Sequence, residues 1–261
     1  MKVTDRAYAL ELDKNDPLAS YRTKFVITDP NLCYLDGNSL GRLPHATVKA
    51  VSDFVSHEWG KEVVTGWSHW IDEAQVAGDL LVAPPSVQQP ARSWSAIHIS
   101  DFYQLCLAAI SARPGRKTII TDAANFPTDR YILDGIAKQL GLNLVIIDNE
   151  DPAIAVNERI TAELLEKYMS EDVALVTFEV IQYRSGARTD IQSVTDLARS
   201  YGAYVVWDAS HATGAIEMNF DACGVDLAVG CTYKYGNSGP GSPAWLYVNK
   251  RVQKELQVPI Q

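Results

Sequence analysis

Three residue types that could perform chemistry together stand near the ends of consecutive apolar runs. Asp208 directly follows the run AYVVW, His211 comes three residues later, and Lys234 lies 26 residues after Asp208, past a second apolar run, DLAVGCT. Pyridoxal phosphate (PLP) is carried as a Schiff base on a lysine amine, and a carboxylate keeps its pyridine nitrogen protonated. These three residues therefore indicate PLP chemistry.

The elements around these residues must bring the amine and the carboxylate to one place. Asp208 follows a predicted strand, so its carboxylate should lie at the C-terminal end of that strand, where open α/β sheets bind ligands. Lys234 stands between Tyr233 and Tyr235 and is followed by GNSGPG, whose glycines would let the backbone approach a cofactor closely. Each signal alone has a structural alternative: an Asp after a strand is commonly a turn or helix N-cap residue, a lone Lys is commonly solvated, and the tyrosines could be ordinary strand aromatics.

From Lys117 onward, apolar strand patterns alternate with helix patterns. The strands are expected at 117–121, 143–148, 173–180 and 203–207, and the helices at 127–140, 158–169 and 190–200. Strands that alternate with helices of this length are typical of βαβ units. The expected fold class is therefore α/β, with a mostly parallel, doubly wound sheet flanked by helices.

The N-terminal part of the chain has a different pattern. Residues 1–31 alternate charged and apolar positions in a helical rhythm and are expected to form a helical arm, whereas 32–261 are expected to form one large domain. Within that domain we expect a short strand at 33–35 and a tight turn at 36–41. A proline then opens a helix predicted over 44–55.

Composition and charge exclude several classes of protein. The chain has 261 residues, of which 47% are hydrophobic and 21% charged, so it can bury a sizeable core. Its formal net charge of -9 and the absence of a basic run argue against a nucleic-acid partner. It contains neither an apolar run long enough to span a membrane nor a signal peptide, so we expect a cytoplasmic protein with no membrane partner. The four cysteines lack zinc-ligand spacing, so we expect reduced thiols and no metal: Cys33, Cys106, Cys223 and Cys231.

Five motifs in order resemble one known family. They are YLDGNSLGRLP (34–44), GWSHWID (66–72), NFPTDRY (125–131), VVWDASHATGA (205–215) and GCTYKYGNSGPGSPAWLYV (230–248). The chain resembles the kynureninases, PLP enzymes of the class V aminotransferase-like group, over nearly its whole length. The resemblance implies the large domain of a fold type I PLP-dependent transferase and a homodimer. It also implies a small C-terminal domain, not contained in this sequence, that supplies the arginine for the substrate α-carboxylate.

The resemblance assigns roles to residues of the central motifs. It implies that Lys234 carries PLP and then moves protons as a general acid and base, while Asp208 holds the pyridinium nitrogen. His211 would stack on or hydrogen-bond the cofactor. Tyr233 would bond the phosphate and assist proton transfer at the substrate carbonyl, and Thr232 would shape the phosphate end.

The remaining motifs are implied to complete the cofactor and substrate contacts. By resemblance, Phe126 stacks on the PLP ring and Asp129 bonds near it. Asn38 and Ser39 are implied to contact substrate, and Trp67 to line the pocket for the substrate's aromatic ring. From the residues alone, the same motifs could be a proline-initiated helix, a tight turn and a packed aromatic loop.

The family defines an expected reaction and leaves two alternatives. Kynureninases hydrolyse the Cβ–Cγ bond of L-kynurenine to anthranilate and L-alanine in tryptophan catabolism, and some act on 3-hydroxykynurenine. One alternative is a catalytically incompetent fragment that acts only by binding or dimerisation. The other is a cysteine desulfuration reaction, which none of the cysteines favours because none lies in an evident Gly/Ser-rich loop. Turnover of kynurenine or of cysteine would separate these hypotheses.

The segment 82–100 departs from the family pattern. Relatives carry an Asp-Ser/Thr-Thr-Ser-Val-Asn type sequence here, whose amides and hydroxyls bind the PLP phosphate at a helix N-terminus. This chain has VAPPSVQQPARSWSAIHIS, and Ser100 and Asp101 could cap the helix that follows. We hypothesise a locally altered reading frame. Resequencing the coding DNA tests this, because compensating frame changes should restore the hydroxyl-rich pattern.

Overall fold

The centre of the structure is a six-stranded sheet. The computed structural model describes residues 2–82 and 98–257. The strands lie in the order β2-β1-β3-β4-β5-β6, the first five parallel and β6 antiparallel to β5. Their bounds are β1 Thr118–Asp122, β2 Asn143–Ile147, β3 Val173–Glu179, β4 Tyr204–Asp208, β5 Leu227–Cys231 and β6 Ala244–Val248. This arrangement confirms the predicted fold class.

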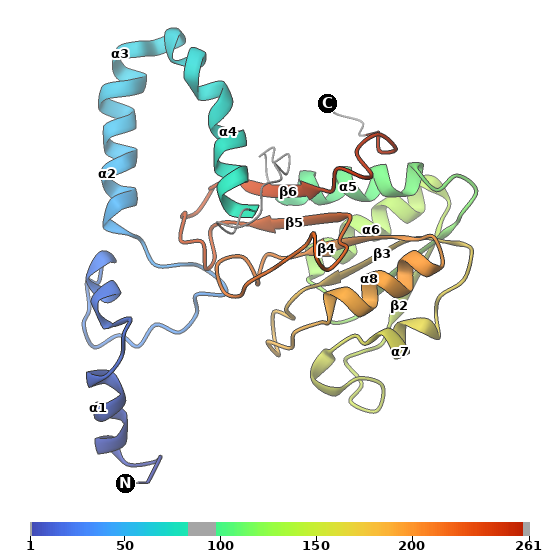
Figure 1. Ribbon diagram of the computed structural model, residues 1–261, viewed down its shortest axis with the longest axis horizontal. Coiled ribbons are helices and arrows are strands. Elements are labelled where there is room, and N and C mark those ends of the chain that lie inside the picture. The colour runs from blue at the N-terminus through green and yellow to red at the C-terminus, as the bar shows by residue number, and fades with distance from the viewer. Residues whose placement is uncertain (1, 83–97, 258–261) are drawn as a thin grey trace.

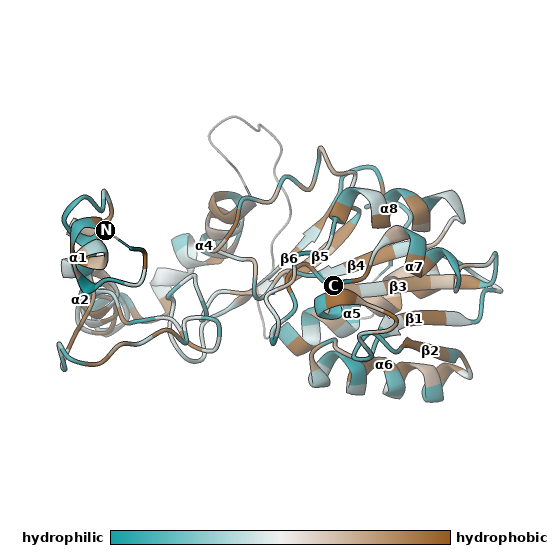
Figure 2. Ribbon diagram, turned by 90° about the horizontal axis from the view of Figure 1, so that it is seen from below, coloured by the Kyte–Doolittle hydropathy of each residue, from teal (hydrophilic) through white to brown (hydrophobic). Residues whose placement is uncertain are grey.

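Helices cover both faces of the sheet (Figure 2). One face packs against α5 (His98–Ser111) and α6 (Pro127–Leu140) through a cluster that includes Phe102 and Leu133. The other face packs against α7 (Ala162–Glu166) and α8 (Ile191–Ser200) through a cluster that includes Phe178 and Trp207. Successive strand side chains point to opposite faces, so a strand buried on both sides must be apolar throughout. That requirement explains the continuous apolar runs in the sequence.

Most predicted strand and helix bounds agree with the structure to within one residue. The helix expected at 158–169 is shorter than predicted, because the 3-10 turn η4 (Val156–Glu158) precedes it and α7 spans five residues. The strand expected at 33–35 was wrong. Leu35 is 84% exposed, and the only bridge described in this part of the chain joins Phe25 to Pro44. A strand needs a paired neighbour for its backbone groups, and residues 33–35 have none among the described residues.

The N-terminal elements stand away from the sheet (Figure 1). They are α1 Arg6–Lys14, the 3-10 helix η1 Ala19–Lys24, α2 His45–Asp53, the π-helical turn η2 Phe54–Trp59, α3 Gly60–Glu62, the 3-10 turn η3 Val63–Gly66 and α4 Trp67–Val82. None of the residues of α1, η1 and α2 is buried. The C-terminal end of α4 returns to the sheet, where Leu80 and Leu81 border a groove beside Trp245. The boundary of the arm at residue 31 stays a prediction.

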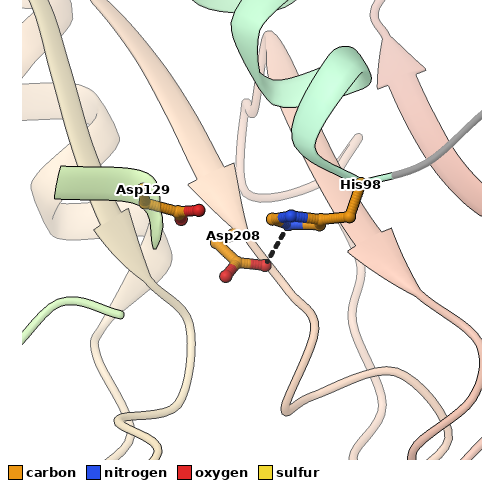
Figure 3. A group of neighbouring side chains, drawn as sticks. All are labelled: His98, Asp129 and Asp208. Carbon is orange, nitrogen blue, oxygen red and sulfur yellow. Dashed lines mark hydrogen bonds and ion pairs between the residues drawn. The ribbon is translucent and has the colours of Figure 1, made fainter. Parts of the chain in front are cut away.

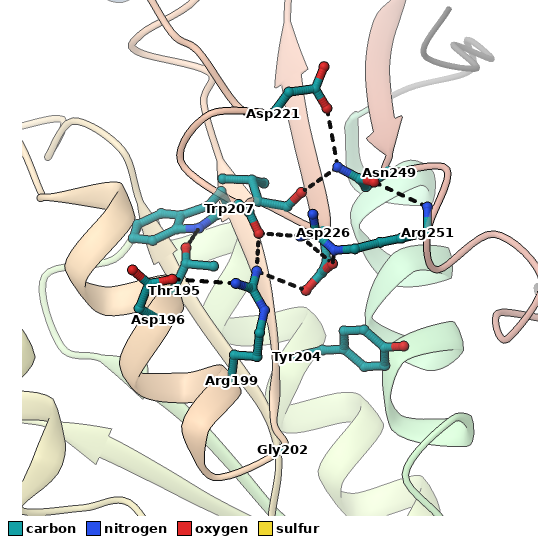
Figure 4. A network of polar contacts seen from close by, with 12 residues as sticks. Thr195, Asp196, Arg199, Gly202, Tyr204, Trp207, Asp221, Asp226, Asn249 and Arg251 are labelled. Atoms are coloured by element: carbon teal, nitrogen blue, oxygen red, sulfur yellow. Dashed lines mark hydrogen bonds and ion pairs between the residues drawn. The ribbon is translucent and has the colours of Figure 1, made fainter. Parts of the chain in front are cut away.

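A polar network ties the edge of the sheet to its neighbours (Figure 4). The Arg251 guanidinium lies 2.6 Å from the Asp226 carboxylate, and Arg199 of α8 lies 3.7 Å from the other carboxylate oxygen. The Trp207 indole N–H donates to the Thr195 hydroxyl at 3.0 Å. These contacts join β4, α8, the segment just before β5 and the turn just after β6. They fix the strand that carries Asp208.

Among the residues that the structure describes, no helix is both long enough and apolar enough to cross a membrane.

Candidate active site

Three buried carboxylates end three neighbouring parallel strands. Asp122 ends β1, Glu179 ends β3 and Asp208 ends β4, and each is at most 3% exposed. The chain leaves β1 toward β2 on one side and resumes as β3 on the other side, so this edge contains a topological switch point. Open α/β sheets bind ligands at such a point, outside the carboxyl ends of the strands. The sheet therefore gathers acidic groups where a ligand is expected.

Asp208 is held by an imidazole and a backbone amide. His98 Nε2, at the start of α5, lies 3.2 Å from Asp208 Oδ1, and the Ser210 amide donates to the same oxygen at 2.8 Å. Burial alone would lower the pKa of His98. The charge of the facing Asp208 outweighs burial, so that the pKa of His98 is raised to about 9. Burial raises the pKa of Asp208, and the His98 charge more than offsets this and holds it well below its usual range. The pair is therefore an imidazolium and a carboxylate at neutral pH.

Asp129 adds a second carboxylate to the same cluster (Figure 3). It lies in the first turn of α6, is fully buried, and neither of its oxygens has a hydrogen-bond partner among the described residues. Burial and the charge of Asp208 raise the pKa of Asp129 well above its usual range. Ligand-type atoms of His98, Asp129 and Asp208 lie within 4.8 Å of one another. No sequence spacing predicts this cluster, because its members come from three separate elements.

Lys234 lies buried in the loop after β5. Its Nζ is 2.5 Å from His211 Nε2, 5.3 Å from the ring centre of Phe126 and 5.8 Å from that of Tyr233. The side chain is only 5% exposed. The Gly41 amide donates to the Tyr233 carbonyl at 2.9 Å, which ties the N-terminal turn to this loop. A lysine amine shielded from water and surrounded by rings is available for covalent chemistry.

His211 stands between Lys234 and a third acidic residue. Its Nδ1 lies 3.1 Å from Glu179 Oε1, and its ring lies 6.1 Å from those of Phe126 and Tyr183. Burial and then the charge of Lys234 lower the pKa of His211 to about 4. His211 is therefore a neutral imidazole at physiological pH. Burial and nearby carboxylates, Asp208 first, raise the pKa of Glu179 well above its usual range.

The predicted substrate contacts are not all brought to this cluster. Asn38 and Ser39 lie in the turn beside the Lys234 loop, where the Ser39 hydroxyl donates to Asp36 Oδ1 at 2.8 Å. Trp67 is 62% exposed at the start of α4, and no described contact joins it to the residues around Lys234. The roles of these three residues stay predictions.

Thr232 and Tyr233, the two residues before Lys234, were predicted to contact the cofactor. Thr232 Oγ1 donates to the Pro243 carbonyl at 2.6 Å and lies 3.0 Å from the Ser242 hydroxyl. Burial and then Cys231 raise the pKa of Tyr233 to about 12, so this phenol keeps its proton. Tyr233 can therefore donate a hydrogen bond at any physiological pH.

The start of α5 adjoins residues that the structure does not describe. The helix is described from His98, so Ser100 and Asp101 lie in its first described turn, and their role as caps stays a prediction. Asp101 is buried, and burial raises its pKa to about 6. Most of the altered segment, 83–97, lies outside the described residues, and with it most of the predicted phosphate-binding region.

Three site residues were missed by the motifs. Glu179 and Asp122 each end a strand that is otherwise largely apolar. An acidic residue in that position could have indicated a site, because burying a carboxylate is costly unless it has a function or a partner. Asp122 accepts from the Gln182 amide at 2.8 Å, and burial raises its pKa to about 7. No such signal precedes His98, which lies 110 residues from its partner in the sequence.

The described residues fit the ring of PLP. The buried primary amine of Lys234 lies near the ring of Phe126, which in turn packs edge-on against Tyr183, and such rings can cover a flat ring. Asp129, whose buried oxygens have no hydrogen-bond partner among the described residues, leaves a polar group available to a ligand. Asp208 supplies the carboxylate that a pyridinium nitrogen requires. A buried amine, paired carboxylates and an aromatic wall at the carboxyl edge of this sheet define a PLP-dependent enzyme of fold type I.

Comparison with known proteins narrows this class. The Aminotransferase class-V family matches residues 103–260, and the chain belongs to this family. It is 34% identical to a kynureninase of Deinococcus radiodurans over 256 residues, which cover 95% of this chain and 58% of the relative. It is 33% identical to a kynureninase of Burkholderia mallei (strain SAVP1) over 261 residues, or 98% of this chain and 60% of the relative. The chain therefore spans about three fifths of the length of these relatives.

Solved structures agree on the fold. A NifS-like protein superposes with a TM-score of 0.68 at 17% identity, covering 83% of this chain and 59% of that protein. The cysteine desulfurase CsdA from Escherichia coli gives 0.70 at 18% identity, covering 91% and 59%. A C-DES variant with glycine covalently linked to its PLP cofactor gives 0.71 at 15% identity, covering 87% and 59%. The family and these neighbours confirm the predicted fold and the prediction of a PLP cofactor.

Proposed function

We propose that this site catalyses the hydrolysis of L-kynurenine, or its 3-hydroxy derivative, to anthranilate, or 3-hydroxyanthranilate, and L-alanine. The observation that carries the proposal is the buried Lys234 amine, 2.5 Å from His211 and enclosed by the ring of Phe126. The kynureninases that this chain resembles at 33–34% identity support the choice of reaction within the class. The substrate is thus a small amino acid with an aromatic ketone side chain.

The residues of the chain divide the work around the cofactor. PLP, when bound, would supply the electron sink that stabilises negative charge on the substrate carbon that bears the amine. Lys234 binds it and later holds or releases a proton at Nζ. Asp208 would hold the ring nitrogen of the cofactor, and Phe126 would pack against its ring. Tyr233, which keeps its phenolic proton, can donate to the phosphate or to the substrate carbonyl.

Burial of the site favours controlled proton transfer. Lys234, His211 and Asp208 are each at most 5% exposed, so the reacting groups are shielded from bulk water. Electrostatic interactions are stronger in such an environment than in water.

A product assay with matched variants tests this proposal. The purified chain is incubated with PLP and L-kynurenine, and anthranilate is followed by fluorescence while alanine is quantified separately. Equal amounts of the two products are expected, and Lys234→Ala should abolish both. Lys167→Ala, at an exposed position after α7, serves as the control and should keep full activity.

Two other results would replace the proposal. Absence of product from a chain that binds PLP would favour the alternative of a kynureninase-like fragment that acts only by binding. Release of alanine from cysteine, with no reaction on kynurenine, would favour desulfuration. In the structure, Cys33 is exposed and Cys106 and Cys231 are buried.

We also propose that the chain forms a homodimer through its N-terminal part. Large apolar side chains are exposed there in unusual number, including Trp59, Val64, Trp67, Ile71 and Leu80. Large apolar side chains that are exposed close together in the sequence support an interaction surface here. Sedimentation velocity should give a dimer for the intact chain, and a monomer at all accessible concentrations would contradict the proposal.

A further inference from the structure

Glu179, His211 and Lys234 form a continuous row of three titratable groups. Glu179 Oε1 lies 3.1 Å from His211 Nδ1, and His211 Nε2 on the other side of the ring lies 2.5 Å from Lys234 Nζ. All three side chains are at most 5% exposed. The imidazole therefore connects the carboxyl group at the end of β3 to the amine in the loop after β5.

The two atoms that face each other at the carboxyl end of this row are Glu179 Oε1 and His211 Nδ1. Glu179 Oε1 and His211 Nδ1 have no hydrogen-bond partner among the described residues, although they face each other within ion-pair distance. The other carboxyl oxygen, Oε2, accepts from the Tyr183 amide at 3.3 Å, which holds the carboxyl group in place. Buried polar atoms without partners are costly, so a proton shared between Oε1 and Nδ1 would satisfy both.

Two proton arrangements fit this geometry with His211 neutral in each. In one, Glu179 is a carboxylate, His211 has its proton on Nδ1, and Lys234 is an ammonium ion that donates to Nε2. In the other, Glu179 is a carboxylic acid, His211 has its proton on Nε2, and Lys234 is a neutral amine. Both arrangements have the same net charge. Burial disfavours separated charges, so the second arrangement, which has none, gains from the depth of the site.

We propose that Glu179 is the terminal proton acceptor of a relay through His211 that converts the Lys234 ammonium to a free amine. The N–H bond of the ammonium breaks as a new bond forms at His211 Nε2. The N–H bond at Nδ1 breaks as an O–H bond forms at Glu179 Oε1. No proton is gained from solvent or lost to it, and the amine is left with the lone pair that bonding to an aldehyde requires.

The electrostatic surroundings of Glu179 and of His211 suit a relay that ends at Glu179. Burial and neighbouring carboxylates raise the pKa of Glu179 well above its usual range, so it accepts a proton readily. The pKa of His211 is lowered to about 4 by burial and by Lys234, so the ring passes a proton on without remaining charged. A group in the middle of a relay must have this property.

Other charged groups face the row from several elements. Asp208 of β4 and His98 of α5 act on His211, and the charge of Lys234 in turn acts on Asp129 of α6 and on Cys231 of β5. They are fixed in place and buried or nearly so.

They set the electrostatic background of the relay, but none lies between the imidazole and Glu179. Asp208, Asp122 and Asp129 also raise the affinity of Glu179 for a proton. Glu179 is therefore the group whose removal should affect Lys234 through the imidazole.

The relay deepens the proposed function, because it prepares Lys234 for the cofactor, and it can be tested without kynurenine or PLP. The cofactor-free chain is treated with formaldehyde and cyanoborohydride near neutral pH, and methylation of Lys234 is followed by peptide mass spectrometry. The exposed Lys167 gives an internal reference. Glu179→Gln keeps the size of the side chain but cannot take up the proton. We expect it to slow Lys234 methylation on the order of tenfold relative to Lys167, as a change of one pKa unit would.

Two further measurements make the test specific. Glu179→Asp keeps an acidic group and should restore part of the rate, whereas the surface variant Glu163→Gln should behave as the unsubstituted chain does. Infrared spectroscopy of the unsubstituted chain near neutral pH should show a protonated carboxyl band that is weaker in Glu179→Gln. Circular dichroism verifies that each variant is folded.

The outcomes separate the relay from the proposed enzyme activity. Equal Lys234 methylation in Glu179→Gln and the unsubstituted chain would overturn the relay, as would the absence of any protonated carboxyl band in the unsubstituted chain. Neither result depends on turnover. If the relay is supported and kynurenine is not hydrolysed, the proposed function fails alone.

Discussion

The ion pair between His98 and Asp208 should make the stability of the cofactor-free chain depend on pH in a defined way. We consider His98→Gln, which keeps a polar side chain beside Asp208 but removes the positive charge. Asp208 is 3% exposed, so its carboxylate would lose its nearest cation while remaining buried. A buried charge that has lost its partner is strongly destabilising.

The size of the effect follows from the pKa of His98. Folding raises it from 6.5 to about 9, because the Asp208 charge outweighs the effect of burial. At about 1.4 kcal/mol per pKa unit, this corresponds to about 3 kcal/mol of folding free energy. A group whose pKa is raised on folding contributes fully below its unfolded pKa. Its contribution is lost as pH rises through the folded value, so the window here runs from about pH 6.5 to about pH 9.

Urea unfolding followed by tryptophan fluorescence measures this contribution, since Trp207 is fully buried. At about pH 6, His98→Gln should be less stable than the unsubstituted chain by about 3 kcal/mol, and the difference should shrink toward zero by about pH 10. His45→Gln, at the exposed start of α2, is the control and should show no such trend. A difference that stays constant across this range would refute the reasoning.

Three further substitutions test the packing around the site. Gly41→Ala should displace the Lys234 loop, because its Cβ would collide with the Lys234 carbonyl oxygen. Urea unfolding should show a loss of about 1–3 kcal/mol of stability. Gly135→Ala, where nothing lies within 4 Å of the added Cβ, is the control and should not destabilise the protein. Leu133→Ala should cost about 2–5 kcal/mol by calorimetry, because the side chain is fully buried between α6 and the sheet. Asp226→Asn should cost about 1–2 kcal/mol, since its arginine partners are each more than 40% exposed; no loss on urea unfolding would show that the network in Figure 4 is not stabilising.

The centre of the sheet was predictable because β3, β4 and β5 are buried along their whole length. That burial demands an uninterrupted apolar run, and the runs that end at Glu179 and Asp208 are such patterns. The C-terminal end of α6 was also predictable, because glycine commonly follows the last residue of a helix. Gly141 adopts the left-handed conformation of such a cap, with φ of 66°. Local chemistry therefore determined these bounds.

The contacts within the site were less accessible from the sequence. His98 meets Asp208 through the packing of α5 on the sheet, and no local pattern encodes a contact between residues so far apart. The row of Glu179, His211 and Lys234 likewise depends on the strand order, which places the ends of β3, β4 and β5 side by side. The motifs indicated the lysine, the imidazole and the carboxyl groups of Asp208 and Asp129, but they could not indicate that the carboxyl group of Glu179 faces the imidazole.

The most direct test of the account is the visible absorption spectrum of the purified chain with added PLP, measured before and after borohydride reduction. We expect a Schiff-base band that disappears on reduction, with the reduced cofactor attached to the peptide that contains Lys234, and no such band in Lys234→Ala. A spectrum identical in the two proteins, or a cofactor attached to another lysine, would contradict the assignment of this site.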